Sequence, residues 1–417
     1  MGEALGDECR YFKVNLLLAP GINIKRSPLG GRGYEYYSED PYLTGKVAES
    51  FIKGVQKTGT GTSIKHFAAN NAETLRINMS SDVDERALRE IYLAPFEIGV
   101  KNAKPWTVMS CYNKVNGVQM AENRELLTDI LRDEWGFNGV VVSDWGGVKD
   151  RIKALEAGND LDMPENQRSN QSVVDAVRRG ILSEAVLDQS VERILELVFK
   201  AKEQERFTDD MDFESHRNLS RKVAEESVVL LKNEKGLLPI TKEKYKKVAV
   251  IGAFAREPRY QGGGCTLVNP IRISRPYEEM EKLAGKNIEL TYAKGYELKD
   301  ETSDELIHEA EEAAREADIA VIFGGLWVAY DREGFDRKHL EIDSSHIRLI
   351  EAVSRVQKRV VVVLSNGDAV VMSPWLDHVG AVVEQFLVGE TVGEALARVL
   401  FGEVNPSGKL PDRKSVV

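Results

Sequence analysis

The chain has 417 residues, of which 42% are hydrophobic and 29% are charged. This length predicts two or three domains, and the composition is that of a folded, water-soluble protein, which excludes disorder, collagen-like repeats and a disulfide scaffold. Acidic residues outnumber basic residues by 67 to 56, for a net charge of −11. This acidic balance argues against a nucleic-acid partner.

Neither a membrane segment nor an export signal is predicted. The longest uncharged apolar stretch, residues 319–330, is shorter than the roughly 18 residues that suggest a membrane-spanning helix. The start of the chain, Met1–Glu8, is acidic, whereas a secretory signal is basic and then apolar, so we expect a cytoplasmic protein. The three cysteines are widely spaced and the histidines lack HExxH spacing, so we expect neither a disulfide nor a metal site.

The first half of the chain alternates short β-rich runs with amphipathic helices. Strands are predicted at residues 14–18, 62–65, 107–111 and 140–142, and near Leu161. Helices are predicted at residues 43–57, from the N-cap residue Asp84 onward, at 126–131 with a break at Gly136, and from Leu187 onward. Repeated βα units predict a parallel sheet, and the closed barrel and the open doubly wound sheet are its two common forms.

An acidic stretch at Thr208–Glu214 is the best linker candidate in the chain. We therefore expect a first domain at residues 1–207, a linker at 208–222 and a second domain at 223–417. In the second domain, helices are predicted at 223–231 and 304–317, and strands at 248–251, 288–292, 319–323, 360–364 and 382–386. This alternation predicts a second α/β domain with an open, mostly parallel sheet.

Two positions carry candidate functional side chains on the residue pattern alone. Asp144 is the last residue but one of the run Gly139–Trp145, at the carboxyl end of a buried strand, where catalytic groups collect in barrel enzymes. The alternative is that Asp144 caps a following helix. Lys65 and His66 end another short strand, which is a weak signal by itself. The glycines at 262–264 lack GxGxxG spacing and are interpreted as a loop.

Several longer runs occur in one fixed order along the chain. They are Leu18–Glu35, Ser38–Pro41, Lys65–Asn71, Asp84–Tyr92, Ser143–Trp145, Ser227–Asn233, Glu333–Arg337 and Leu400–Pro411. Together these runs resemble glycoside hydrolase family 3, in particular its β-glucosidases, over nearly the whole chain. The resemblance implies a (β/α) barrel-type domain followed by an α/β sandwich domain, with the active site between them.

The resemblance also implies the chemistry of two carboxyl groups. Asp144 corresponds to the nucleophile that attacks the anomeric carbon, and Glu333 corresponds to the general acid and base. A retaining mechanism of this kind places the two groups about 5 Å apart, so retention of configuration is expected. Without the resemblance, Glu333 is typical of a solvated acid in the charged stretch 331–337.

Sugar recognition is implied at six further positions. The family pattern places Arg32, Lys65, His66, Arg76 and Tyr112 around the glycone, with Trp145 against the apolar face of the sugar. By residue type alone, Arg76 is typical of a surface helix and Tyr112 of a core. A tryptophan after the nucleophile resembles the glucosidase branch, so we expect release of glucose from the non-reducing end of β-D-glucosides or short β-gluco-oligosaccharides.

The chain departs from the family pattern in two places. Residues 1–17 do not match the family's Asp-Gly-Pro segment, whose Asp binds sugar hydroxyls, so the barrel is expected to be incomplete at its amino-terminal side. Cys265 and Thr266 replace the usual serines of the glycine-rich loop. A retaining β-glucosidase is the leading hypothesis. A truncated, catalytically impaired sugar-binding homologue and an unrelated two-domain α/β binding protein are the alternatives.

The resemblance also bears on partners. It implies a small-molecule glycoside as the partner and no cofactor, with no nucleic acid or membrane. A homo-oligomer is left open.

Overall fold

The computed structural model describes residues 1–412, which divide into two compact units. Residues 1–27 and 36–212 form the first unit, and residues 28–35 join the chain from Phe213 onward in the second. Helix α8 (Phe213–Ser227) begins within the segment predicted as a linker, 208–222. Residues 413–417 of the predicted second domain lie outside the described residues.

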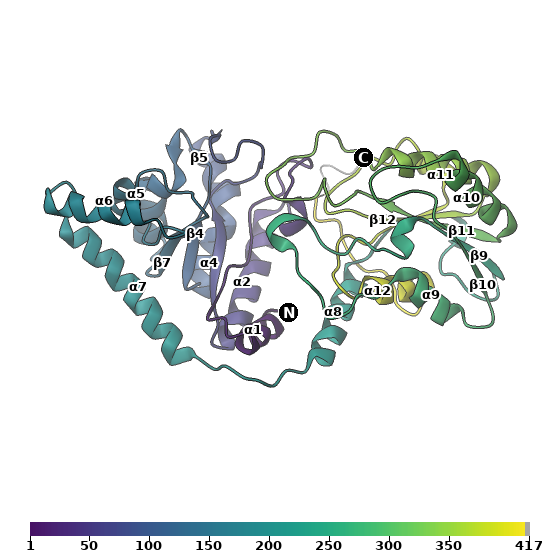
Figure 1. Cartoon of the computed structure of the whole chain (residues 1–417), viewed down its shortest axis with the longest axis horizontal. Coiled ribbons are helices and arrows are strands. Elements are labelled where there is room, and N and C mark those ends of the chain that lie inside the picture. Colours follow the sequence, from purple (N-terminus) through teal and green to yellow (C-terminus); the bar gives the residue numbers. More distant parts are fainter. Residues whose placement is uncertain (413–417) are drawn as a thin grey trace. The chain divides into compact units, whose positions relative to one another are not determined.

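The first unit is built on a parallel sheet whose strands are neighbours in chain order (Figure 1). The strands are β1 (Leu16–Leu17), β2 (Gly61–Phe67), β4 (Thr107–Ser110) and β7 (Val140–Ser143). Leu161 adds a single parallel bridge to Val142. Four of the five predicted strands are therefore confirmed, and the fifth, near Leu161, is reduced to a single bridge. Chain-order pairing is the arrangement of consecutive units in a βα barrel.

Helices cover both faces of this sheet. Val108 and Val141 share a core with residues of α2 (Pro41–Lys57) and α4 (Ala94–Ala103). Met109 and Val142, the next residues along the same strands, pack against α7 (Glu184–Gln204). This alternation is the period of two expected of a strand buried on both sides.

Several further elements belong to the first unit. They are α1 (Gly2–Tyr11), β3 (Ser80–Ser81), α3 (Glu85–Ala87), η2 (Leu88–Leu93), β5 (Lys114–Val115), β6 (Val118–Gln119), η4 (Glu125–Glu134), α5 (Arg151–Ala157) and α6 (Gln167–Arg178). Asp84 caps α3 by accepting a hydrogen bond from Ala87 N, which confirms the predicted helix start.

The second unit contains a six-stranded sheet in the order β10-β9-β11-β12-β13-β8. The strands in chain order are β8 (Val229–Asn233), β9 (Lys247–Ile251), β10 (Glu289–Ala293), β11 (Ile319–Gly325), β12 (Val360–Ser365) and β13 (Ala381–Glu384). All pairings are parallel except that of β8 with β13. The predicted helix at 223–231 is wrong from Val229 onward, because this apolar run pairs with the edge of the sheet.

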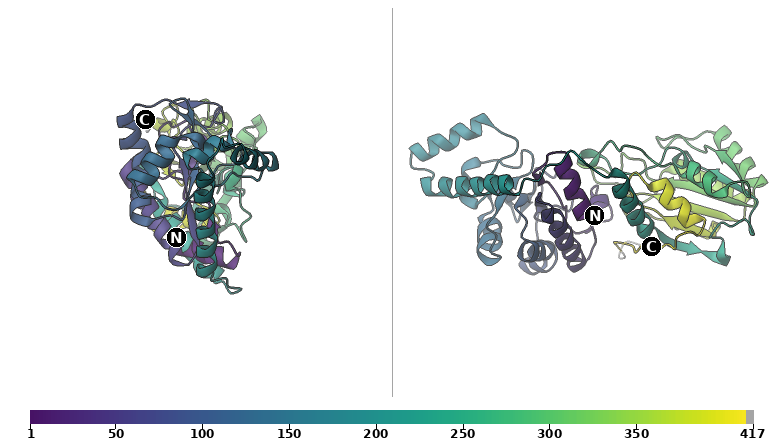
Figure 2. Two further views of the ribbon diagram at one scale, coloured as in Figure 1. Left: turned by 90° about the vertical axis from the view of Figure 1, so that its left-hand side faces the viewer. Right: turned by 90° about the horizontal axis from the view of Figure 1, so that it is seen from below.

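Helices lie on both faces of the second sheet (Figures 1 and 2). They are α9 (Pro276–Ala284), α10 (Asp304–Glu316), α11 (Ser344–Val356) and α12 (Val392–Leu400), and α12 packs against α8 and α9. The α/β class with mostly parallel sheets is confirmed. Among residues 1–412, no helix is both long enough and apolar enough to cross a membrane.

Candidate active site

Asp144 lies directly after β7, at the carboxyl end of the sheet of the first unit. Its backbone N–H donates to Ser110 O of β4 at 3.0 Å, and its Oδ1 accepts from Trp145 N at 2.8 Å. The next helix, α5, is capped by Asp150, whose Oδ1 accepts from two of its first N–H groups. Asp144 therefore does not cap a helix, and its buried carboxylate stands where parallel strands collect functional groups.

His66 is a polar side chain next to this carboxylate. Its Nε2 lies 3.7 Å from Asp144 Oδ2, and the residue is only 1% exposed. Asn23 fixes its backbone by accepting from His66 N and donating to His66 O, both at 2.9 Å. Lys65 precedes His66 in β2, where its N–H donates to Pro20 O and its carbonyl accepts from Ile22 N. Two of the predicted site residues, Asp144 and His66, thus lie next to each other.

Trp145 presents an exposed aromatic surface beside Asp144. The residue is 47% exposed although it follows a buried strand. Large aromatic side chains that stay exposed next to polar groups are suited to cover the apolar face of a ligand. The contact between Trp145 and a sugar, which the sequence resemblance implies, stays a prediction.

Arg76 and Tyr112 form a second group in the same unit. The guanidinium carbon of Arg76 lies 4.3 Å from the centroid of the Tyr112 ring. Arg76 occupies a turn rather than a helix, and its Nη1 donates to Glu73 Oε2 at 2.7 Å. Tyr112 is buried, as a core residue would be, but one face of its ring carries the Arg76 cation.

Glu333 belongs to the second unit, in a turn after β11. Its side chain is 19% exposed, and its Oε2 accepts from Cys265 N at 3.3 Å. Arg32 Nη1 lies 3.7 Å from Glu333 Oε1, while the same guanidinium donates twice to Glu35 at 2.7 and 2.8 Å. Glu333 is therefore a partly buried acid with fixed partners, not a solvated surface residue.

Residues 28–35 bind the loop that carries Glu333. Arg337 N donates to Leu29 O at 2.8 Å, and Gly31 N donates to Asp336 Oδ1 at 3.1 Å. A Cβ atom at Gly31 would lie 1.6 Å from Phe335 O, so only glycine permits this approach. Burial and, to a smaller extent, the hydrogen bond with Glu333 raise the pKa of the Cys265 thiol to about 11. Cys265 therefore stays protonated at neutral pH.

Three residues that contact the predicted site residues, Asn23, Glu35 and Glu73, were not themselves predicted as site residues. Glu35 and Glu73 each lie three residues from a predicted arginine, a spacing that suits an ion pair, whereas Asn23 gave no such signal. Among residues 1–412, no three His, Cys, Asp or Glu side chains are arranged as metal ligands.

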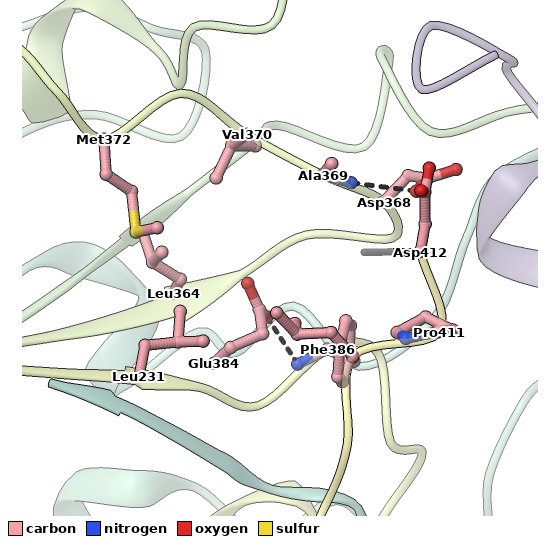
Figure 3. Close-up of a pocket in the computed structure, with 11 residues that line it drawn as sticks. Leu231, Leu364, Asp368, Ala369, Val370, Met372, Glu384, Phe386, Pro411 and Asp412 are labelled. Carbon is pink, nitrogen blue, oxygen red and sulfur yellow. Dashed lines mark hydrogen bonds between the residues drawn. The ribbon is translucent and has the colours of Figure 1, made fainter. Parts of the chain in front are cut away.

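A further acid of the second unit lines an apolar pocket (Figure 3). Burial raises the pKa of Glu384 to about 8, although its carboxylate accepts hydrogen bonds from Phe386 N at 2.7 Å and Asn366 Nδ2 at 2.9 Å. Leu231, Leu364 and Met372 supply apolar walls of this pocket. Glu384 is therefore protonated at neutral pH, because its surroundings solvate the anion poorly.

Comparison with known proteins covers both units. Residues 1–197 match the glycosyl hydrolase family 3 N-terminal domain, and residues 228–414 match the family 3 C-terminal domain. A thermostable beta-glucosidase B of Acetivibrio thermocellus is 51% identical over 99% of this chain and 54% of its own length. An exo-alpha-(1->6)-L-arabinopyranosidase of Bifidobacterium longum is 45% identical over 98% of this chain and 55% of its own.

A solved structure shares the fold of both units. The GH3 beta-glucosidase of Bifidobacterium adolescentis superposes with a TM-score of 0.93 at 45% identity, covering 98% of this chain and 60% of that one. The chain thus spans about half the length of the curated relatives it matches. The family resemblance seen in the sequence is confirmed, and the chain belongs to glycosyl hydrolase family 3.

Proposed function

We propose that this chain is a retaining glycoside hydrolase that releases glucose from the non-reducing end of β-D-glucosides by double displacement. The observation that carries the proposal is the group at the carboxyl end of β7. There the buried carboxylate of Asp144 lies 3.7 Å from His66 and is followed by the exposed Trp145. A carboxylate beside a polar group and an aromatic surface is what a nucleophile for a sugar ring requires.

The proposed reaction needs two carboxyl groups in opposite protonation states. Asp144 attacks the anomeric carbon as the carboxylate, while Glu333 donates a proton to the departing glycosidic oxygen. This step forms a covalent glycosyl ester on Asp144. Glu333 then takes a proton from water, which attacks the anomeric carbon and restores both acids. Two inversions leave the released sugar with the configuration of the substrate.

The groups around each acid support the assignment of Asp144 as the nucleophile and Glu333 as the general acid and base. A protonated His66 beside Asp144 would favour the ionised carboxylate by Coulomb attraction. Beside Glu333, Arg32 shares its positive charge with Glu35, so its attraction to Glu333 is partly offset. An acid that must hold its proton benefits from a weaker neighbouring cation.

Asp144→Ala tests the nucleophile directly. The variant should lose roughly 10⁴-fold or more in kcat on an aryl β-D-glucoside. Added azide should restore turnover by entering the space of the missing carboxylate, and the product should be the α-glucosyl azide. Asp150→Asn is the matched control, because asparagine caps α5 as well as aspartate does. Loss of activity without azide rescue would contradict the assignment of Asp144.

A second sugar follows from the comparisons. Because one relative is named as an exo-alpha-(1->6)-L-arabinopyranosidase, we propose α-L-arabinopyranosides as the alternative substrate. This sugar lacks the hydroxymethyl group of glucose. The ratio of kcat/KM for the nitrophenyl β-D-glucoside and the nitrophenyl α-L-arabinopyranoside decides between them.

The cytoplasmic location and the homo-oligomeric state of the protein are also proposals. Cell fractionation tests the cytoplasmic location, and light scattering after size exclusion tests for a homo-oligomer. Calorimetric binding of glucose without turnover would favour the impaired sugar-binding alternative.

A further inference from the structure

Glu73 is a buried acid in the turn that follows β2. The residue is 3% exposed, and a carboxylate at such a position is costly unless a cation or N–H groups compensate it. Arg76 supplies one such cation, because its Nη1 donates to Glu73 Oε2 at 2.7 Å. The backbone closes the same turn, because Arg76 N donates to Glu73 O at 3.2 Å.

The face of the Arg76 guanidinium is held as well. The Tyr112 ring centroid lies 4.3 Å from the guanidinium carbon, so an ion pair and an aromatic ring constrain the same group. Gln119 Nε2 donates to Tyr112 O at 2.7 Å and to Gly147 O at 3.1 Å. Gln119 thereby ties the loop after β4 to the loop after β7, which carries Asp144.

We infer that Glu73 is a positioning residue that holds the Arg76 guanidinium over Tyr112 in the orientation in which it binds a sugar hydroxyl. The inference rests on the proposed function, since it assigns Arg76 to the glycone. An arginine side chain has many rotamers, and fixing it before the substrate arrives removes an ordering cost from binding and from the transition state. Glu73 itself does not touch the substrate.

A purely structural ion pair is the competing explanation. Breaking a buried pair destabilises a fold whether or not its arginine binds a ligand. The two explanations differ in one measurable respect. If Glu73 positions a guanidinium, it should also position a guanidinium ion that is not attached to the chain.

The experiment uses chemical rescue of the full chain. Arg76→Ala should lose about tenfold to a hundredfold in kcat/KM on the nitrophenyl glycoside that the chain hydrolyses best, and low, non-denaturing guanidinium chloride should restore part of it. Glu73→Gln alone should lose a similar factor. In the double variant Glu73→Gln/Arg76→Ala, guanidinium should restore none of the lost kcat/KM. Without guanidinium, the double variant should have nearly the same kcat/KM as either single variant.

Glu90→Gln is the matched control. Glu90 pairs with Arg86 on the surface of the same unit, and its side chain is 62% exposed. Glu90→Gln should keep wild-type kcat/KM, and Glu90→Gln/Arg76→Ala should be rescued as well as Arg76→Ala. Thermal unfolding accompanies each variant. If Glu73→Gln does not fold, the same experiments use Glu73→Asp. This variant keeps the negative charge, but its side chain is one methylene shorter and holds the guanidinium less closely.

The outcomes separate the inference from the proposed function. Wild-type kcat/KM in Glu73→Gln, or undiminished rescue of the double variant, would overturn the positioning role. A wild-type chain that turns over neither glycoside would instead overturn the proposed function. In that case calorimetric binding of glucose to the same variants decides the role of Glu73, which is supported if Glu73→Gln weakens binding as much as Arg76→Ala does.

Discussion

A basic side chain stands beside each of the two candidate catalytic acids. His66 Nε2 lies 3.7 Å from Asp144, and Arg32 Nη1 lies 3.7 Å from Glu333. These distances are too long for a strong hydrogen bond. Arg32 is always a cation, whereas His66 attracts the Asp144 carboxylate by charge only when its ring is protonated. Arg32 also makes two hydrogen bonds to Glu35, which partly offsets its attraction to Glu333.

Glu333→Gln separates the acid step from the rest of the reaction. A glutamine cannot protonate a leaving oxygen, so alkyl β-glucosides should lose roughly 10²- to 10⁴-fold in kcat/KM. A dinitrophenyl glucoside needs no protonation of its leaving group and should lose much less in the step that forms the intermediate. Steady-state kinetics over a series of leaving groups measures this difference.

Glu341→Gln is the control for this series, because its side chain is 60% exposed and lies on the same segment. It should leave the dependence on leaving group unchanged. Equal losses on alkyl and dinitrophenyl glucosides in Glu333→Gln would count against the acid and base role.

At the scale of elements, the loop with Glu333 depends on a segment from the other half of the sequence. Residues 28–35 bind this loop through backbone hydrogen bonds and through the close approach of Gly31 to Phe335 O. A loop held in this way keeps its carboxyl group in one place, as an acid catalyst requires.

Gly31→Ala should therefore displace the loop. The added Cβ would lie 1.6 Å from a carbonyl oxygen, so the backbone must move. We expect kcat/KM on alkyl glucosides to fall at least about tenfold. Gly324→Ala in β11 is the control, since its Cβ would meet the nearest atom at an ordinary 3.6 Å. Wild-type kinetics in Gly31→Ala would contradict the role of residues 28–35.

At the scale of the whole molecule, each unit has its own core. The cores of the first unit gather around β2, β4 and β7, and the larger core of the second surrounds its six strands. The proposed reaction draws one acid from each unit, so both units must be folded for activity.

The free energy of unfolding of the second unit should decrease at higher pH because of Glu384. Burial raises its pKa from 4.5 to about 8. Between these values the folded state keeps a proton that the unfolded chain has released, so the free energy of unfolding falls as pH rises. Below the lower value both states are protonated and this loss is absent.

Glu384→Gln should remove this pH dependence. The free energy of unfolding of the wild type, relative to the variant, should fall by a few kcal/mol between pH 5 and pH 8. Denaturant unfolding followed by circular dichroism at several pH values measures the difference, and the other titrating groups cancel in it. A difference that stays constant with pH would show that Glu384 ionises normally.

The sequence alone determined the positions of the strands of the two larger sheets except β8, but not those of the short strands β3, β5 and β6. Runs such as residues 140–143 and 360–365 combine β-branched residues with flanking breaks, and these are local properties. Family membership was also readable, because several motifs occur in one order. The run at 229–233 was mispredicted, since its apolar residues suit a continuing helix and only the edge of the sheet made it a strand.

Only the tertiary structure decided which side chains support the site. Glu35 and Glu73 look like surface acids in the sequence, and their roles follow from the arginines that they meet, Arg32, which is buried, and Arg76, which is partly buried. Residues 28–35 join the second unit although they lie near the start of the chain. Local sequence governs the dihedral angles of a segment, whereas burial and pairing depend on the path of the whole chain, which brings residues about 300 positions apart into contact.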